Sequence, residues 1–308
     1  MRITSAHAFE SSVANLQRRQ QSLSDLQERM TSGKRVLRAG DDPTAAANAE
    51  RALAAESRSN AQLRSLGASR NAMTLAESAL GDASELLHRA RELMVGAGNG
   101  SYSDKERVGQ AQALRGLRDD LLMVANRSDG SGRYLFGGQG SDSPPLVDAI
   151  GGVIYVGATG ELRAAGGEAT PLALDGRAAW LQAPDAAIPG TTISVFDALD
   201  RAVGELQIGG RTSVAVALTV SQGLSDIDSL QANVSNWRTR TGESLNRGDG
   251  IENRLGQVKL DAQRQRSEAE DLDMVSAISE FQTRQSGYDA ALKTYSLVQR
   301  MSLFDYLK

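Results

Sequence analysis

The sequence has no cysteine and only two histidines, His7 and His88, among its 308 residues. Without thiols the chain can form no disulfide, no cysteine-based zinc site and no cysteine nucleophile, and two isolated histidines do not make a histidine-rich metal centre. His88 has no second metal-binding residue of this kind near it, so we interpret it as a solvated or packing side chain. The composition therefore predicts a protein without a metal or other cofactor.

Long apolar runs and a surplus of basic charge are also missing. No segment reaches the roughly 20 apolar residues of a membrane helix, and the first residues lack the apolar core of a cleaved secretory signal. The 34 basic and 38 acidic residues give a net charge of −4, whereas nucleic-acid binders are usually basic. We expect neither a membrane nor a nucleic acid as a partner. Taken alone, the missing signal indicates a cytoplasmic protein.

Catalytic motifs are absent as well. The sequence contains no P-loop and no GxGxxG pattern, and the glycines at 96–100 follow a helical segment, which predicts a turn. Asp41 and Asp42 could act as an acid and base pair, but helix capping explains them better because Pro43 follows directly. The Arg247-Gly248-Asp249 tripeptide is short enough to arise by chance. We predict that the protein is not an enzyme.

Glycine and proline are concentrated in one part of the chain. Twelve of the 31 glycines lie between residues 130 and 176, and five of the six prolines lie between residues 144 and 189. Short apolar runs there, such as 153–156 and 179–181, alternate with glycine pairs that favour hairpin turns. The sequence predicts a mainly α fold, an elongated rod of long antiparallel helices that carries a small β-rich insert at 131–193.

Apolar residues in the flanking segments recur every three or four positions, as they do along a coiled-coil seam. This spacing predicts a helix from about Phe9 to Met30, ending near Gly33, and a second that begins after Asp42. In the second helix, alanines alternate with larger apolar residues along the seam from Met73 to Met94. This implies that a neighbouring helix approaches it closely. Ser103 or Asp104 is expected to cap a third helix that runs to about Asn126.

After the insert the helical spacing resumes. We expect helices over 196–206 and 212–240, a polar turn at 246–250, and a last helix from Ile251 to about Tyr306. The first and last helices share one period, so they are predicted to pair with each other and with neighbouring copies. Three domains follow: 1–40 with 271–308, a terminal coiled coil disordered in the monomer; 41–130 with 194–270, the helical rod; and 131–193, the outer insert.

The terminal segments then point to a family. The opening Met-Arg-Ile-Thr, the stretch MTSGKRVLRAGDDPTAAANA at 30–49 and the ending YSLVQRMSLFDYLK at 295–308 resemble the flagellin-like family of bacterial flagellar proteins. The Asp42-Pro43 junction and the Ser302 to Leu307 ending are more similar to the hook–filament junction members of that family than to flagellin. The resemblance covers both helical ends, and the insert matches nothing.

The resemblance implies a structural subunit that is exported unfolded through the flagellar type III apparatus, secreted and built into the extracellular flagellum. Its implied partners are further copies of itself in a ring, hook-associated protein 1, flagellin and a cytoplasmic export chaperone. This route needs no cleaved signal, so the resemblance reverses the cytoplasmic interpretation. The residues expected at the assembly interface are Phe9, Val13, Leu16, Leu23, Met274, Ile278, Phe281, Leu292, Tyr295, Leu303 and Phe304.

Two alternatives stay open from the sequence. The first is flagellin itself, the filament subunit. The second is a binding module or enzyme within the insert, for example one that acts on surface glycans, where Trp180 and Tyr155 could stack on a sugar. The insert has no histidine and no motif around its carboxylates, so this second alternative has little support.

Overall fold

The structure is a computed structural model that describes residues 2–141, 143–164, 170–185, 188 and 190–306, with side chains described from Phe9 to Leu297 within those ranges. The chain packs into two compact units. The terminal unit consists of Met1–Ser59 and Gly256–Lys308, and the central unit consists of Asn60–Leu255. This division differs from the three domains expected from the sequence, so the three-domain scheme stays a prediction.

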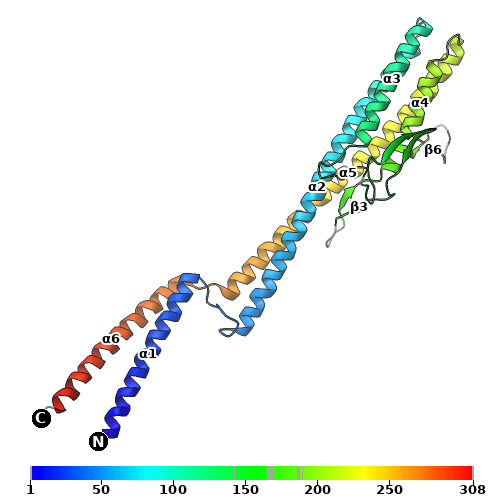
Figure 1. Ribbon diagram of the computed structural model, residues 1–308. Coiled ribbons are helices and arrows are strands. Elements are labelled where there is room, and N and C mark those ends of the chain that lie inside the picture. Colours follow the sequence, from blue (N-terminus) through cyan, green and yellow to red (C-terminus); the bar gives the residue numbers. More distant parts are fainter. Residues whose placement is uncertain (1, 142, 165–169, 186–187, 189, 307–308) are drawn as a thin grey trace. The chain divides into compact units, whose positions relative to one another are not determined.

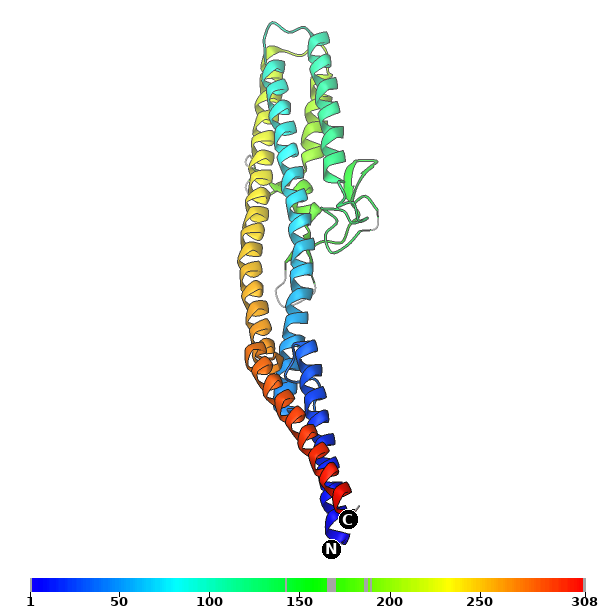
Figure 2. The same cartoon turned by 90° about the vertical axis from the view of Figure 1, so that its left-hand side faces the viewer.

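Two helices pair along the terminal unit. Helix α1 spans Arg2–Ser32 and helix α6 spans Met274–Tyr306, and they lie side by side in two views (Figures 1 and 2). The unit also holds the first residues of α2 (Pro43–Ala97) and the last residues of α5 (Ser213–Glu270). The predicted pairing of the two ends is thus present within a single chain.

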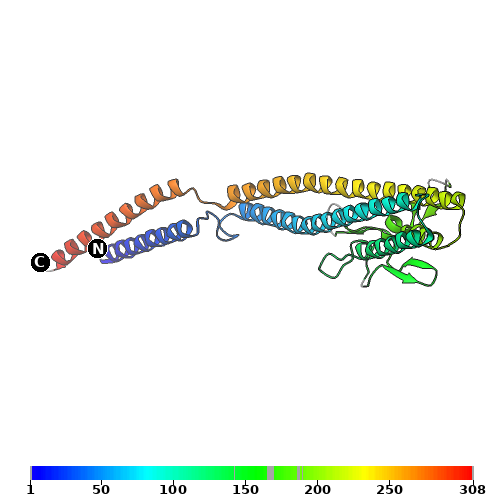
Figure 3. The ribbon, with the colours of Figure 1, turned by 90° about the horizontal axis from the view of Figure 1, so that it is seen from above.

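The central unit is a bundle of four helices. Most of α2 and α5 run antiparallel here (Figure 3), and the shorter helices α3 (Asp104–Ala125) and α4 (Val195–Leu206) pack on each other beside them. Along α2, each residue of the predicted seam from Met73 to Met94 is almost fully buried, alanines included. On α5, an added Cβ at Gly223 would overlap Cε of Met94. The close approach predicted from the alanines is confirmed.

Among the described residues between α3 and α4 there are six short strands. They form three separate antiparallel pairs: β1 (Leu146–Ala149) with β2 (Gly152–Tyr155), β3 (Leu162–Arg163) with β4 (Pro171–Ala173), and β5 (Ala183–Pro184) with β6 (Thr192–Ile193). The turn between β1 and β2 uses Gly151 at φ +106°, a conformation that favours glycine. The mainly α class with a small antiparallel β region is confirmed.

Three expected elements are wrong, and one of them is the last helix, which begins at Met274 and not at Ile251. The segment 246–250 is not a turn, because α5 continues through it to Glu270 and the break lies at residues 271–273. Gly248 stands where α5 approaches α2, since a Cβ there would meet the side chains of Leu66 and Arg70 at ordinary contact distance, and Asp249 pairs with Arg70 at 3.2 Å. The apolar run 179–181 is not a strand, because Arg177–Leu181 forms one π-helical turn that buries Trp180.

Candidate assembly surface

Helices α1 and α6 meet along a seam that mixes small, aromatic and polar side chains. Ala277 is nearly buried, and the ring of Phe9 lies 5.7 Å from the ring of Tyr295, centroid to centroid. Arg284 donates to the backbone oxygen of Ser22 at 3.0 Å and also bonds its hydroxyl. The pair is therefore held by a few specific contacts and buries little apolar surface of its own.

Much of the apolar surface of α6 remains uncovered by α1. Val275 is 81% exposed and Leu297 is 60% exposed. Met274, Ile278 and Leu292 are each at least 40% exposed. Large exposed apolar side chains that recur along a paired helix are candidates for contact with further helices. We call Met274, Val275, Ile278, Leu292 and Leu297 the α6 apolar stripe.

Some of the residues predicted for the assembly interface lie in the seam between α1 and α6, and others lie in the α6 apolar stripe. The predicted residues of α1 differ in burial. Phe9 is 49% exposed, whereas Val13, Leu16 and Leu23 are half-buried. On α6, Phe281 and Tyr295 are half-buried in the pairing seam. The side chains of Leu303 and Phe304 lie outside the described residues. Their role in assembly stays a prediction.

Two residues that reasoning from the sequence passed over belong to the stripe. Val275 and Leu297 fall off the three-and-four spacing of the predicted seam, so the heptad pattern did not select them. The residue that α1 buries is Ala277 and not its predicted neighbour Ile278, because the small side chain of alanine lets α1 approach closely. In the sequence, the apolar residues on both sides of Ala277 were the available sign of an exposed apolar surface.

Backbone hydrogen bonds join the segment that follows α1 to the segment between α5 and α6, and we call this contact the clasp. The N–H of Arg35 donates to the oxygen of Glu270 at 2.7 Å, and the N–H of Leu272 donates to the oxygen of Gly33 at 2.9 Å. The Lys34 ammonium lies 3.0 Å from the Glu270 carboxylate. Gly33 has φ +71°, where glycine is favoured, and it ends α1 as expected.

Asp41 and Asp42 both accept hydrogen bonds from backbone N–H groups. Asp41 accepts from the N–H groups of Leu37 and Arg38 at 3.0 and 3.1 Å, and Asp42 accepts from Ala45 at 3.0 Å. These backbone hydrogen bonds lower the pKa of each carboxyl below its usual value. Helix capping is confirmed for Asp42, which caps α2, and was wrong for Asp41, which closes the turn before α2. Within the described ranges, no three metal-ligating side chains come together.

In the central unit, Arg118 connects three elements around a buried guanidinium. It forms a bidentate pair with Asp148 of β1, at 2.6 and 2.5 Å, and reaches Asp200 of α4 at 3.2 Å. The hydrogen bond from Arg118 lowers the pKa of Asp148. The guanidinium also lies 5.7 Å from the centre of the Phe196 ring. Arg118 thus fastens the first hairpin to the helices.

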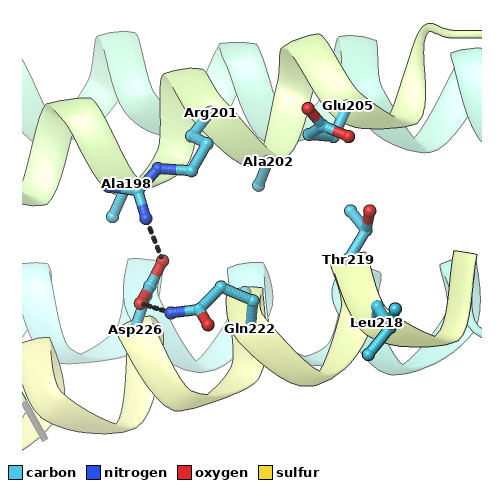
Figure 4. Close-up of a pocket in the computed structure, with 9 residues that line it drawn as sticks. Ala198, Arg201, Ala202, Glu205, Leu218, Thr219, Gln222 and Asp226 are labelled. Atoms are coloured by element: carbon cyan, nitrogen blue, oxygen red, sulfur yellow. Dashed lines mark hydrogen bonds and ion pairs between the residues drawn. The ribbon is translucent and has the colours of Figure 1, made fainter. Parts of the chain in front are cut away.

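A groove of about 300 Å³ lies between α4 and α5 (Figure 4). Small residues form part of its lining, namely Ala198, Ala202 and Gly223. At one end the buried Asp226 accepts from the side-chain amide of Gln222 at 2.7 Å and meets Arg201 at 3.4 Å. Burial raises the pKa of Asp226. The groove therefore holds a carboxylate that is costly to keep charged.

Two aromatic residues of the insert were candidates for stacking on a sugar, Trp180 and Tyr155. Trp180 is fully buried and packs edge-on against Phe136, with ring centroids 5.1 Å apart. The Tyr155 hydroxyl donates toward the backbone oxygens of Phe136 and Ala158, each at 3.3 Å, and burial raises its pKa to about 12. Both aromatic residues hold the insert together. The glycan-stacking alternative was wrong for Trp180, because its ring has no exposed face.

The chain is similar to known flagellar proteins. Residues 5–141 match the family described as the bacterial flagellin N-terminal helical region. The chain is 28% identical to the flagellar hook-associated protein 3 of Salmonella typhimurium over 99% of both chains, and 28% identical to that of Escherichia coli over 91% of this chain and 92% of the other. The chain is therefore similar to flagellin-like proteins, and over nearly its whole length to these two hook-associated proteins.

Flagellins either match a smaller share of this chain than the two hook-associated proteins do, or match it at lower identity. A Listeria monocytogenes flagellin is 26% identical over 86% of this chain and 84% of its own length. Flagellin E of Vibrio cholerae is 36% identical, but over only 36% of this chain and 30% of that one. The resemblance to the hook-associated junction proteins is confirmed, and it fits better than the flagellin alternative.

Solved structures show the same fold. A putative flagellar hook-associated protein from Vibrio parahaemolyticus superposes with a TM-score of 0.64 at 21% identity, covering 75% of this chain and all of that one. FlgL from Xanthomonas campestris superposes with a TM-score of 0.60 at 21% identity, covering 71% of this chain and 99% of that one. No helix in the described part of this chain is long and apolar enough to cross a membrane.

Proposed function

We propose that this flagellin-like chain is a structural subunit of the bacterial flagellum that joins hook to filament. It assembles by packing its terminal helices against those of neighbouring copies. The observation that carries the proposal is the α6 apolar stripe, which stays exposed although α6 is already paired with α1. Extended helices with an uncovered apolar side are suited to helix-in-groove packing in a larger assembly.

The proposed partners follow from the two ends of such a junction. Copies of this chain form a ring, hook-associated protein 1 lies on the hook side, and flagellin lies on the filament side. A cytoplasmic export chaperone holds the terminal helix before secretion. A chain without cysteine supports this route, since no disulfide forms that would hinder passage in an unfolded state. The final location is the extracellular flagellum, and the role is structural without catalysis.

Coupled folding and assembly explains why a few contacts between α1 and α6 are enough in a single chain. Most of the stability of a helix in a protein comes from tertiary packing, and α1 and α6 bury little apolar surface on each other. Part of the cost of ordering α1 and α6 is then met when copies associate. The α6 apolar stripe and the side chains of Leu303 and Phe304 are the groups we expect to be buried in that step.

The proposal is tested by electron microscopy of flagella from a strain that lacks this chain. Hooks without filaments, with flagellin shed into the medium, are the expected result. Normal filaments would overturn the proposal. Loss of the filament protein itself, with no flagellin shed, would instead identify the chain as flagellin.

A substitution in the stripe tests the proposed interface. Val275→Ser removes an exposed methyl pair from α6, so it should reduce filament number in a complemented strain while the melting temperature of the free protein stays nearly unchanged. Val214→Ser is the matched control, because Val214 is 68% exposed at the start of α5 but lies in the central unit. Equal filament numbers in the two variants would contradict a role for the stripe.

A further inference from the structure

The turn between α2 and α3 contains the one Asn-Gly pair of the sequence, Asn99-Gly100. Both residues are exposed. The turn closes through a backbone bond from the N–H of Tyr102 to the oxygen of Asn99 at 3.0 Å. Neither the assembly proposal nor the capping of α3 uses the Asn99 side chain.

The side chain of Asn99 is folded back along its own backbone. Its oxygen Oδ1 accepts from the Ser101 N–H at 3.1 Å and from the Ser101 hydroxyl at 2.9 Å. This is an Asx turn, in which the side chain bonds the backbone two residues on. The peptide nitrogen between the two bonded residues is that of Gly100.

The nitrogen of Gly100 is open to react. Within the described residues its N–H donates no hydrogen bond, and no atom lies within 4 Å of the place where a Cβ would stand. Glycine also gives this peptide the freedom to rotate toward the carboxamide. The Gly100 nitrogen and the Asn99 carboxamide are therefore adjacent in an exposed turn.

We propose that Asn99 is a site of spontaneous deamidation in the folded protein. Water or hydroxide takes the proton from the Gly100 nitrogen, which attacks Cγ of Asn99. The new N–Cγ bond closes a succinimide, and the Cγ–Nδ2 bond breaks as ammonia leaves with the proton. Water then opens the ring at either carbonyl and yields aspartate or isoaspartate. No oxidant or reductant is needed.

Ser101 assists the attack through its two donors. Negative charge develops on Oδ1 when the nitrogen adds to Cγ, and donors already placed at that oxygen stabilise it. The other asparagines lack this combination. Those within helices are followed by N–H groups committed to the helix, and Asn126 uses its amide to bond the N–H and C=O of Leu146.

The modification would change both charge and geometry at this turn. It adds a carboxylate a few residues before α3, beside Asp104 and Glu106 of its first turn. In the isoaspartate form the main chain gains a carbon, which is incompatible with the bond from Tyr102 to Asn99. Gly98 packs against Val220 of α5 on the other side of the turn, so the change is confined to residues 99–102.

Peptide mapping by mass spectrometry tests the proposal on the purified full chain kept in warm, mildly alkaline buffer. The amide-to-acid mass gain should accumulate at Asn99 ahead of every helical asparagine. A methyltransferase that labels isoaspartate should report the second product. Gly100→Ala should slow the conversion severalfold, because a Cβ hinders the attack. The matched control Gly96→Ala, at a helical glycine with open space around it, should leave the rate unchanged.

Three results would overturn the proposal. One is an intact Asn99 when helical asparagines are already converted. Another is the same rate in Gly100→Ala as in wild type. The third is conversion that proceeds in the urea-unfolded chain but stops in the folded chain, which would show that the turn protects Asn99.

Discussion

Single residues in this molecule show how burial and hydrogen bonding set the cost of a charge. Arg118 is buried but surrounded by three carboxylates, so its charge is well compensated. Asp226 is equally buried but meets only the Gln222 amide and the tip of Arg201. Burial, aided by the charge of Asp185, raises the pKa of Asp226 despite both contacts. One group is therefore stabilised as an ion and the other is not.

Asp226→Asn should stabilise the protein at neutral pH. A pKa raised in the folded state means that ionised Asp226 opposes folding, and this penalty disappears as the pH falls below the pKa of the unfolded chain. The amide keeps a hydrogen-bonding partner for Gln222 but carries no charge to desolvate. We expect a gain on the order of 1 kcal/mol in unfolding free energy, measured by urea denaturation from neutral to acidic pH.

The difference between variant and wild type should shrink toward acidic pH. Arg201→Gln is the companion variant, since it removes the other half of the pair and leaves Asp226 less compensated, so it should destabilise the protein at neutral pH. A loss of stability in Asp226→Asn at neutral pH would mean that the ion pair outweighs burial.

At the scale of elements, local signals located helix boundaries where a capping residue or a proline marks them. Ser103 caps α3 with a reciprocal box, accepting from the Glu106 N–H while the Glu106 carboxylate accepts from the Ser103 N–H. Pro43 begins α2 behind Asp42. These starts depend on neighbours in sequence, and they could be predicted. The helix through 246–250 could not be predicted, because Gly248 lies where α5 packs against α2.

Ser103→Ala should weaken the start of α3. The hydroxyl satisfies an otherwise free N–H of the first turn, and replacing such a cap typically costs about 1 kcal/mol. Thermal unfolding of the full chain measures the loss, with Ser235→Ala, at an exposed position within α5, as the control. An unchanged melting temperature in Ser103→Ala would show that solvent replaces the cap.

The Glu106 half of the box adds a pH dependence. Hydrogen bonds from Ser103 lower the pKa of Glu106, so this stabilisation is present above the unfolded pKa of the carboxyl and is lost as the pH falls through the folded one. The melting temperatures of wild type and Ser103→Ala should therefore converge in acid.

At the scale of the whole molecule, the helical pattern, the pairing of the chain ends and the resemblance to flagellin-like proteins could be predicted from the sequence, because periodicity and terminal motifs are local. The sequence did not disclose the separate strand pairs or the buried Trp180, since these depend on contacts across the insert. For the candidate surface, Met274, Ile278 and Leu292 were found by spacing, while Val275 and Leu297 were missed because they lie outside that spacing.

Limited proteolysis should distinguish the two units. The terminal unit has few fully buried side chains, whereas the central unit contains the main apolar core. In dilute solution we expect cleavage first within 1–30 and 275–308, which would leave the 60–255 region intact. Assembly into flagella should protect the same ends. Persistence of both ends in the free protein, under conditions that cut the central unit, would contradict coupled folding and assembly.

The clasp between Lys34 and Glu270 joins residues 236 positions apart in the chain. Closing a loop of that length costs entropy that shorter loops do not pay, although the cost rises only slowly with length. The turns between α2 and α3 and between α4 and α5 close short loops and can form early. Once they fold, the ends of the chain are carried close together. The clasp is therefore expected to form last in refolding, so its kinetics should depend on the prior folding of the central unit.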